Sequence, residues 1–300
     1  MSISALPRSR NFSLALVALL PLLIFSRAAV AQTGQADAPS RFAQLDGNKV
    51  HYKSLGKGDE ALVFVHGWTC NMDFWKENES AFAGRTRVIL IDLPGHGQSD
   101  KPQTTYSMDL FARGIEAVLR DAGVKRATLV GHSMGTPVIR QFYRRYPEKT
   151  RALVIVDGSL RPFGDKAAVE KLMAPMRGPN YQEFAGRMID GMVRPVKDEA
   201  RRAEIKAAML RTPQHVAVGA FDAMLDPAIW QQDKITVPVL AIHARQPMWT
   251  PEYEQFVRDL IPHLDYQVWD GVSHFLMMDE PQKFNDALAA FLVANKLMKK

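Results

Sequence analysis

A serine lies in a short segment whose residue types allow a sharp backbone turn. Residues 131–135 have the sequence Gly-His-Ser-Met-Gly, with Ser133 at the centre. The apolar run Ala127–Val130 precedes this segment, and the residues after it have a helical pattern. Gly131 and Gly135 permit a tight strand-to-helix turn that exposes the serine hydroxyl. We therefore interpret Ser133 as a candidate nucleophile; an ordinary turn with a capping serine is the alternative.

A serine hydroxyl is a weak nucleophile at neutral pH and needs three kinds of help. A base must take its proton, and a carboxylate must orient that base. Two fixed N–H groups must stabilise the oxyanion that forms after attack. His274 follows the last strand-like segment, Tyr266–Trp269, and is the candidate base. A histidine that only packs in the core or caps a helix is the alternative for this position.

The elements that must position these residues follow from the apolar patterns. An alternating pattern from Phe42 to Leu55, around Asp46–Asn48, predicts a β-hairpin. Continuous apolar runs predict strands buried on both faces. Helical spacing appears between them, so we expect a doubly wound, mostly parallel α/β sheet. The predicted strands are Ala61–Val65, Arg87–Ile91, Ala127–Val130, Ala152–Val156, Val237–Ile242 and Tyr266–Trp269, and the predicted helices are Met72–Phe82, Ser107–Ala122, Thr136–Tyr143 and Gln282–Leu297.

One long interval between predicted strands has no strand pattern. Residues 160–233 are rich in methionine, arginine and lysine, and predict a helical cap inserted into the sheet domain. We expect 32–159 and 234–300 to form the α/β core around it. Methionines in the cap could line an adaptable apolar pocket or simply pack its helices. The expected helices are Lys166–Met173, Tyr181–Met192, Asp198–Leu210 and Gln214–Leu225.

The first 31 residues have the three parts of a secretory signal. Arg8 and Arg10 precede an apolar stretch from Phe12 to Phe25, and Ala29-Val30-Ala31 is a typical cleavage site. We expect cleavage after Ala31 and export, to a bacterial periplasm or the medium. An uncleaved anchor is the alternative, although the stretch is shorter than the roughly 20 residues of a membrane-spanning helix.

Composition limits the possible partners. The formal net charge is +6, and three of the positive charges (Arg8, Arg10 and Arg27) lie in the predicted signal, which leaves +3. No run of basic residues suggests nucleic acid as a partner. Cys70 is the single cysteine, so no intramolecular disulfide is possible, and no Cys/His cluster has metal-binding spacing. We expect a small-molecule substrate and no stable membrane span after cleavage; the oligomeric state is left open.

Three further motifs follow predicted strands. They are His66-Gly67-Trp68, the segment Asp92–Ser99 (Asp-Leu-Pro-Gly-His-Gly-Gln-Ser), and Asp270–Phe275 (Asp-Gly-Val-Ser-His-Phe). Together with residues 131–135 they resemble the α/β-hydrolase superfamily from roughly Phe42 to Leu297. The chain is most similar to its capped esterase, haloperoxidase-like and C–C hydrolase branch.

This resemblance implies roles for individual residues. Ser133 would be the nucleophile, which excludes the branches that use an aspartate there, and His274 would be the base. The backbone N–H groups of Trp68 and Met134 would bind the oxyanion. The supporting motif residues would be His66, Gly67, Gly131 and Gly135. The implied mechanism requires no metal and no organic cofactor.

The acid departs from the family pattern. The family usually has it in a turn after the strand Val237–Ile242, but residues 243–249 contain no acid. A subset of the family carries the acid one strand earlier, where this chain has Asp157. Asp157 is our choice, and Glu252 and Glu254 are the alternatives. For Asp92 we expect a structural role, in hydrogen bonds to the Gly95 and Gly97 amides of its own turn.

These features favour an exported serine hydrolase that cleaves an ester-like small molecule through an acyl-enzyme. Two alternatives use the same site differently, namely C–C bond hydrolysis and cofactor-free perhydrolysis. A third is a ligand-binding α/β-hydrolase fold without catalysis, because one fold serves many functions.

Overall fold

A single mixed β-sheet runs through the protein. The structure, a computed structural model, describes residues 1–2 and 38–298. The predicted signal peptide therefore lies outside the described residues, apart from Met1 and Ser2. The strands are β1 (Ser40–Leu45), β2 (Asn48–Leu55), β3 (Glu60–Val65), β4 (Arg87–Ile91), β5 (Arg126–His132), β6 (Thr150–Val156), β7 (Val239–Ala244) and β8 (Leu264–Trp269).

The strand order is β1-β2-β4-β3-β5-β6-β7-β8. β1 and β2 form the predicted antiparallel hairpin, β2 is also antiparallel to β4, and the other neighbours are parallel. The inner parallel strands β3, β5, β6 and β7 are almost wholly buried because helices cover both faces, which explains their apolar sequences. β8, at the edge of the sheet, is mostly half-buried. The doubly wound α/β fold predicted from the sequence is confirmed.

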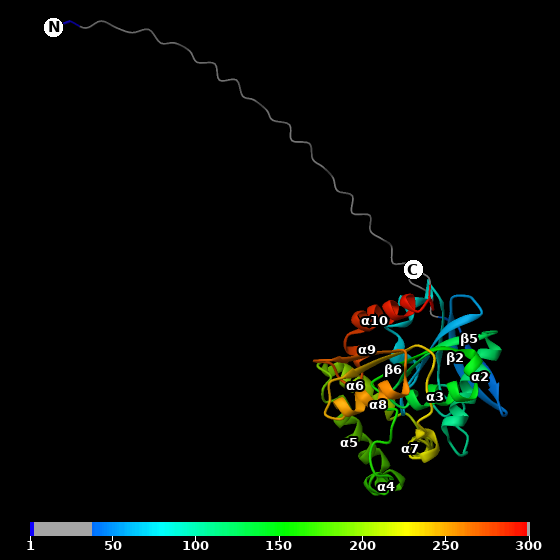
Figure 1. The fold of residues 1–300 in the computed structure, drawn as a ribbon. Helices are drawn as coiled ribbons and strands as arrows, with labels where there is room; N and C mark the ends of the chain where they lie inside the picture. Colours follow the sequence, from blue (N-terminus) through cyan, green and yellow to red (C-terminus); the bar gives the residue numbers. More distant parts are fainter. Residues whose placement is uncertain (3–37, 299–300) are drawn as a thin grey trace. The chain divides into compact units, whose positions relative to one another are not determined.

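Helices pack on both faces of the sheet (Figure 1). α2 (Met108–Asp121) packs beside α3 (Gly135–Arg145), and Ser107 caps α2 by accepting a hydrogen bond from the Leu110 amide. Across the sheet, the Trp75 ring packs between Phe64 of β3 and Phe284 of α10. The C-terminal helices are α9 (Leu276–Asp279) and α10 (Pro281–Ala294).

Two local predictions were incomplete. Instead of one helix over Met72–Phe82, the chain forms the 3-10 helix η1 (Met72–Trp75) and a separate α1 (Glu79–Ala83). Helix α8 (Pro251–Leu260) was not predicted, although Thr250 caps it and Pro251 is its first residue. A further 3-10 helix, η2 (Pro147–Lys149), connects α3 to β6.

The interval between β6 and β7 is helical. It contains α4 (Lys166–Met173), η3 (Ala174–Arg177), α5 (Tyr181–Val193), α6 (Glu199–Met209), α7 (Gln214–Met224) and η4 (Pro227–Trp230). The four α-helices agree with the predicted ranges to within one residue at each end. Trp68, in the loop after β3, connects the sheet to this helical segment, because its Nε1–H donates to the Ala217 carbonyl of α7 at 2.8 Å. The boundaries of a separate cap at 160–233 stay a prediction.

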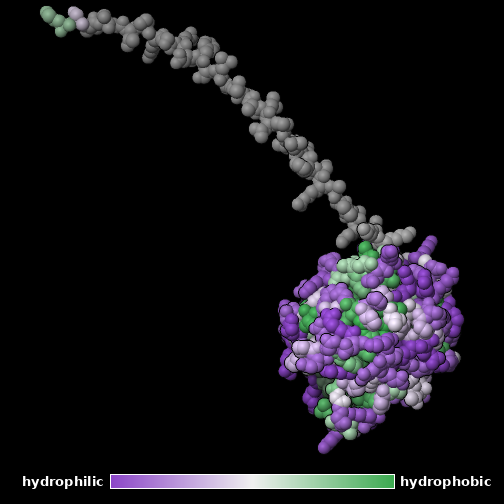
Figure 2. All heavy atoms as spheres, in the orientation of Figure 1, coloured by the Kyte–Doolittle hydropathy of each residue, from purple (hydrophilic) through white to green (hydrophobic). Residues whose placement is uncertain are grey.

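The surface is mainly polar. Figure 2 shows a largely hydrophilic face with small hydrophobic areas between hydrophilic residues. Within residues 38–298 the exposed large apolar side chains are Phe42, Phe163, Leu172 and Met248, which do not adjoin one another in the sequence. Among the described helices, none is both long and apolar enough to cross a bilayer.

Candidate active site

Ser133 lies in the sharp turn between β5 and α3. Its φ of 53° is in the left-handed region, a strained conformation for a residue with a side chain. The neighbouring glycines allow this geometry. A Cβ on Gly131 would lie 2.5 Å from the Gly135 carbonyl oxygen, and a Cβ on Gly135 would lie 2.7 Å from that of Val65. Both glycines therefore permit close packing of β3, β5 and α3, as the sequence motif predicted.

The structure brings His274 and Asp157 together. His274 follows β8, Asp157 follows β6, and the His274 Nδ1–H donates to Asp157 Oδ2 at 2.6 Å. The Asp157 side chain is only 1% exposed, and its φ of 45° is again left-handed. The bond leaves His274 Nε2 without its proton and able to accept one from a hydroxyl.

The alternative acids lie elsewhere. Glu252 and Glu254 are both in the first turn of α8. The Glu254 carboxylate accepts a hydrogen bond from Arg258 of the same helix, at 2.6 Å. Glu252 accepts from Thr250, which, together with a backbone hydrogen bond, lowers the pKa of its carboxyl group. Of the three candidate acids, Asp157 is the one hydrogen-bonded to His274.

Ser133 and His274 line one small cavity. Its volume is about 20 Å³. Two methionines from the inserted helices, one from α5 and one from α6, reach it from above the sheet. Aromatic rings, the Cys70 thiol and backbone atoms form most of the remaining wall, so the space beside Ser133 is mainly apolar. The lining residues are Gly67, Trp68, Cys70, His132, Ser133, Met192, Met209, His274 and Phe275.

The turn after β3 lies directly against the serine. A Cβ on Gly67 would be 3.1 Å from Ser133 Cβ. Within residues 38–298 the amides of Trp68 and Met134 donate to no other protein group, so both N–H groups are available to a ligand. Thr69, which follows Trp68, has a φ of 56°, in the left-handed region. The turn after β3 therefore packs so closely against the serine that a side chain at position 67 would displace it.

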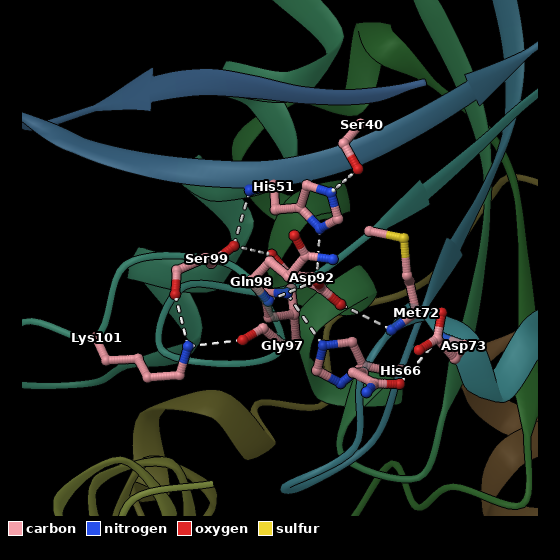
Figure 3. A network of polar contacts seen from close by, with 12 residues as sticks. Ser40, His51, His66, Met72, Asp73, Asp92, Gly97, Gln98, Ser99 and Lys101 are labelled. Carbon is pink, nitrogen blue, oxygen red and sulfur yellow. Dashed lines mark hydrogen bonds and ion pairs between the residues drawn. The ribbon is translucent and has the colours of Figure 1, made fainter. Parts of the chain in front are cut away.

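A buried polar network supports this turn (Figure 3). Its centre is Asp92, whose carboxylate accepts from His51 Nδ1 at 2.7 Å, the Met72 amide at 2.8 Å and the Gln98 amide at 2.8 Å. The prediction that Asp92 bonds the Gly95 and Gly97 amides was wrong, since Gly95 donates to the Asp100 carbonyl. The carboxylate fixes the loop that begins η1 as well as its own turn.

His66 is the second anchor of the turn. Its Nε2 accepts a hydrogen bond from the Leu93 amide at 3.0 Å, so its Nδ1 carries the proton and donates to the Gly67 carbonyl at 2.8 Å. Full burial lowers the pKa of His66, partly offset by the charge of Asp92. His66 is therefore neutral and sets the direction of the Gly67 carbonyl.

Gly97 shows how closely this network is packed. A Cβ there would fall 2.1 Å from Asp92 Cγ, and the residue has a φ of +51°. We expect Gly97→Ala to lower the free energy of unfolding by about 2–4 kcal/mol, from overpacking plus backbone strain. The measurement is a urea midpoint at constant m-value. Gly47→Ala is the matched control, because it also has a positive φ but open space around it. Equal losses in both variants would contradict the packing argument.

His132 holds the backbone of the candidate base. Its Nε2–H donates to the His274 carbonyl at 2.9 Å, a contact that sequence reasoning missed. The two imidazole rings lie 4.7 Å apart between centroids. Burial, reinforced by the charge on His274, lowers the pKa of His132 well below its usual value. The neutral ring can therefore lie beside His274 without repelling its protonated form.

These buried histidines predict an acid-sensitive fold. Burial lowers the pKa of His96 to about 3 and that of His243 to about 4, and it also lowers those of His66 and His132. The unfolded chain binds protons at these sites below about pH 6.5, while the native protein does not. The contribution of these histidines to the free energy of unfolding is therefore fully present above pH 6.5. It decreases as the pH drops towards 4, by up to about 1.4 kcal/mol per pH unit for each histidine.

Urea unfolding between pH 7 and 4.5 checks this prediction. In His96→Asn, which retains a side-chain N–H for the Pro94 carbonyl, the slope of stability against pH should decrease by up to one histidine's contribution. An unchanged slope would show that His96 is not among the responsible groups.

Fold and site together define a class of protein. A doubly wound sheet has at its carboxyl edge a serine on a strained turn, a histidine bonded to a carboxylate and two free backbone amides. The chain belongs to the alpha/beta hydrolase family, whose model matches residues 62–287. It is thus a member of a family of hydrolase enzymes, and the fold implies small-molecule substrates. Among the described residues no group of three or more His, Cys, Asp or Glu is placed to hold a metal ion.

Similar proteins have related but different activities. The chain is 28% identical over 265 residues to a 2-hydroxy-6-oxononadienedioate/2-hydroxy-6-oxononatrienedioate hydrolase of Paraburkholderia phymatum. The aligned region covers 81% of this chain and 91% of the relative. The solved structure of Est816, an N-acyl homoserine lactone degrading enzyme, is 28% identical with a TM-score of 0.70 and covers 84% of this chain and all of its own. An esterase from Exiguobacterium antarcticum has a TM-score of 0.74 at 20% identity over 85% of this chain and 99% of its own, and supports the fold alone.

Proposed function

We propose that this protein is an exported serine hydrolase that cleaves a small ester or lactone through an acyl-enzyme. Ser133 is the nucleophile, His274 the base and Asp157 the acid that orients it. The observation that carries the proposal is the 2.6 Å hydrogen bond from His274 to Asp157, beside Ser133 in one cavity. The lactone-degrading relative supports a cyclic ester as one form of the substrate.

The geometry supports a two-step reaction. His274 Nε2 takes the Ser133 proton as Oγ attacks the carbonyl carbon, and the Trp68 and Met134 amides bind the oxyanion. The imidazolium then protonates the leaving alcohol, and the C–O bond breaks to leave an acyl group on Ser133. Water then enters, and His274 takes one of its protons as the water oxygen attacks the acyl carbon. His274 returns that proton to Ser133 Oγ as the acyl–serine bond breaks, which releases the acid and restores the hydroxyl.

The small cavity favours short acyl groups. At about 20 Å³ it is close to the space of one water molecule. We therefore expect acetyl and propionyl esters to be cleaved faster than octanoyl esters. A hydrophobic pocket discriminates by roughly 10-fold or more for each methylene that it cannot accommodate.

Two experiments test the proposed function. The first measures kcat/KM on p-nitrophenyl esters of increasing acyl length, simple lactones and a panel of diketones. The second measures covalent labelling by a fluorophosphonate probe, with the modified residue identified by mass spectrometry. Ester or lactone turnover with labelling at Ser133 is the expected result. Labelling with turnover of diketones alone would favour C–C hydrolysis, the activity of the Paraburkholderia relative. If the protein shows no labelling and no turnover, a ligand-binding role would be favoured.

Export is part of the proposal and has its own test. It rests on Arg8, Arg10, the apolar stretch and the alanine-rich site that ends at Ala31. N-terminal sequencing of the protein recovered from the periplasm or medium of an expressing bacterium should begin at Gln32. Recovery in the cytoplasmic fraction with an intact N-terminus would contradict it.

A further inference from the structure

The Asp157 carboxylate has more donors than His274 alone. Oδ1 accepts from the Ala244 amide at 2.9 Å and from Trp249 Nε1 at 3.0 Å. Oδ2 accepts from His274 Nδ1 at 2.6 Å and from Gln246 Nε2 at 3.2 Å. Each oxygen therefore has two N–H donors, which fix the rotation of the carboxylate about its Cβ–Cγ bond.

Three of these donors come from one turn. Ala244 is the last residue of β7 and residues 245–249 follow it, in the place where the acid was expected and none was found in the sequence. The turn is closed by a bond from the Trp249 amide to the Gln246 carbonyl at 3.1 Å. The Trp249 ring packs against His243 at 4.2 Å and Tyr253 at 4.9 Å between centroids. The indole N–H is thus held in a fixed direction, towards Asp157.

We propose that Trp249 and Gln246 are positioning residues for the proposed hydrolysis. Their side-chain N–H groups hold the Asp157 carboxylate so that Oδ2 faces His274, and thereby keep the imidazole in the tautomer and orientation that can take the Ser133 proton. This inference rests on the proposed function. A turn that has no acid supplies, in its place, the donors that an acid on the neighbouring strand requires.

A small displacement of a catalytic group has a large effect on the rate. A catalytic group misplaced by about 1 Å can lose about 100-fold in rate. Without Trp249 and Gln246, each carboxylate oxygen would keep one protein donor, Ala244 on one and His274 on the other. The carboxylate would then be free to rotate away from its present alignment. The effect should appear in kcat and leave KM unchanged, since neither side chain lines the cavity beside Ser133.

Single variants separate the donor from the packing. Trp249→Phe removes the indole N–H but keeps an aromatic ring against His243, and Gln246→Met removes the amide at nearly constant length. We expect each to lower kcat for a short p-nitrophenyl ester by about 10-fold, with KM within about two-fold. Trp230→Phe is the matched control, because its Nε1–H donates to the Met224 carbonyl, outside the Asp157 cluster. It should lower the melting temperature without lowering kcat.

A double-variant cycle tests whether the two residues act through Asp157. The readout is the rate constant for fluorophosphonate labelling of Ser133, measured with and without Asp157→Asn. We expect Trp249→Phe to slow labelling in the native background and to have no further effect beside Asp157→Asn. An equal loss in both backgrounds would mean a structural role and overturn the inference, as would native kcat in both single variants. If the unchanged protein shows neither labelling nor turnover, the proposed function fails and the inference with it.

Discussion

Ser133→Ala should lower kcat for ester hydrolysis by about 10⁵–10⁶-fold, a loss of the size measured when the serine of a triad is removed. No other hydroxyl lines the cavity that contains His274. The Cys70 thiol also lines it, but burial raises the pKa of that thiol, so it stays protonated and is a poor replacement for the serine. The Trp68 and Met134 amides, which we propose as the oxyanion donors, are not changed by this substitution, and some rate above the uncatalysed reaction should therefore persist. Steady-state kinetics on p-nitrophenyl acetate, with mass spectrometry of the probe-treated protein, measures both the loss and the absence of labelling.

Ser54→Ala is the matched control for this variant. Its hydroxyl lies on β2 and accepts a hydrogen bond from Arg87 Nε at 3.0 Å, in a different part of the sheet. It should retain full activity and full labelling at Ser133. Measurable burst kinetics in Ser133→Ala would place the nucleophile on another residue and require a different mechanism.

The sheet and the serine turn were predictable because both depend on short-range patterns. The run Ala61–Val65 is continuous and apolar because β3 is covered on both faces. The glycines at 131 and 135 are required by contacts within the turn itself and with the adjacent strand. Helix α8 also has local signals, with Thr250 as its cap and Tyr253 and Val257 on its buried side, so it too was predictable from the sequence.

The contacts that the sequence did not reveal join distant segments. Trp249 and Gln246 reach an aspartate about 90 residues earlier, and Asp92, after β4, bonds the Met72 amide in the loop after the neighbouring strand β3. Such pairs depend on how loops turn at the sheet edge, and neither periodicity nor motif spacing encodes that direction. The bond from His132 to the His274 backbone is of the same kind. Sequence reasoning could propose Asp157 from its position after β6, but not the donors that hold it.

Asp157→Asn should lower kcat by about 10⁴-fold, the loss measured when a triad aspartate becomes an amide. An asparagine at this position has one oxygen and one NH₂ group, whereas the carboxylate accepts two N–H bonds on each oxygen. If the NH₂ group faces His274, it opposes the Nδ1–H and favours the tautomer with the proton on Nε2, which cannot accept the Ser133 proton. If it faces the other way, it opposes the Ala244 and Trp249 donors, and the side chain is displaced.

To identify which acid orients His274, kcat on the same ester is compared among Asp157→Asn, Glu252→Gln and Glu254→Gln. Both glutamates lie in the first turn of α8, and Glu254 pairs with Arg258, so removing either charge should change kcat by less than about two-fold. Folding of all three variants is checked by urea unfolding, because Asp157→Asn also leaves buried donors unpaired. A folded Asp157→Asn with native turnover, together with a large loss in one glutamate variant, would transfer the orienting role to that glutamate. With the loss confined to Asp157→Asn, the acid of the site is the one at the end of β6, and residues 244–249 serve it as donors.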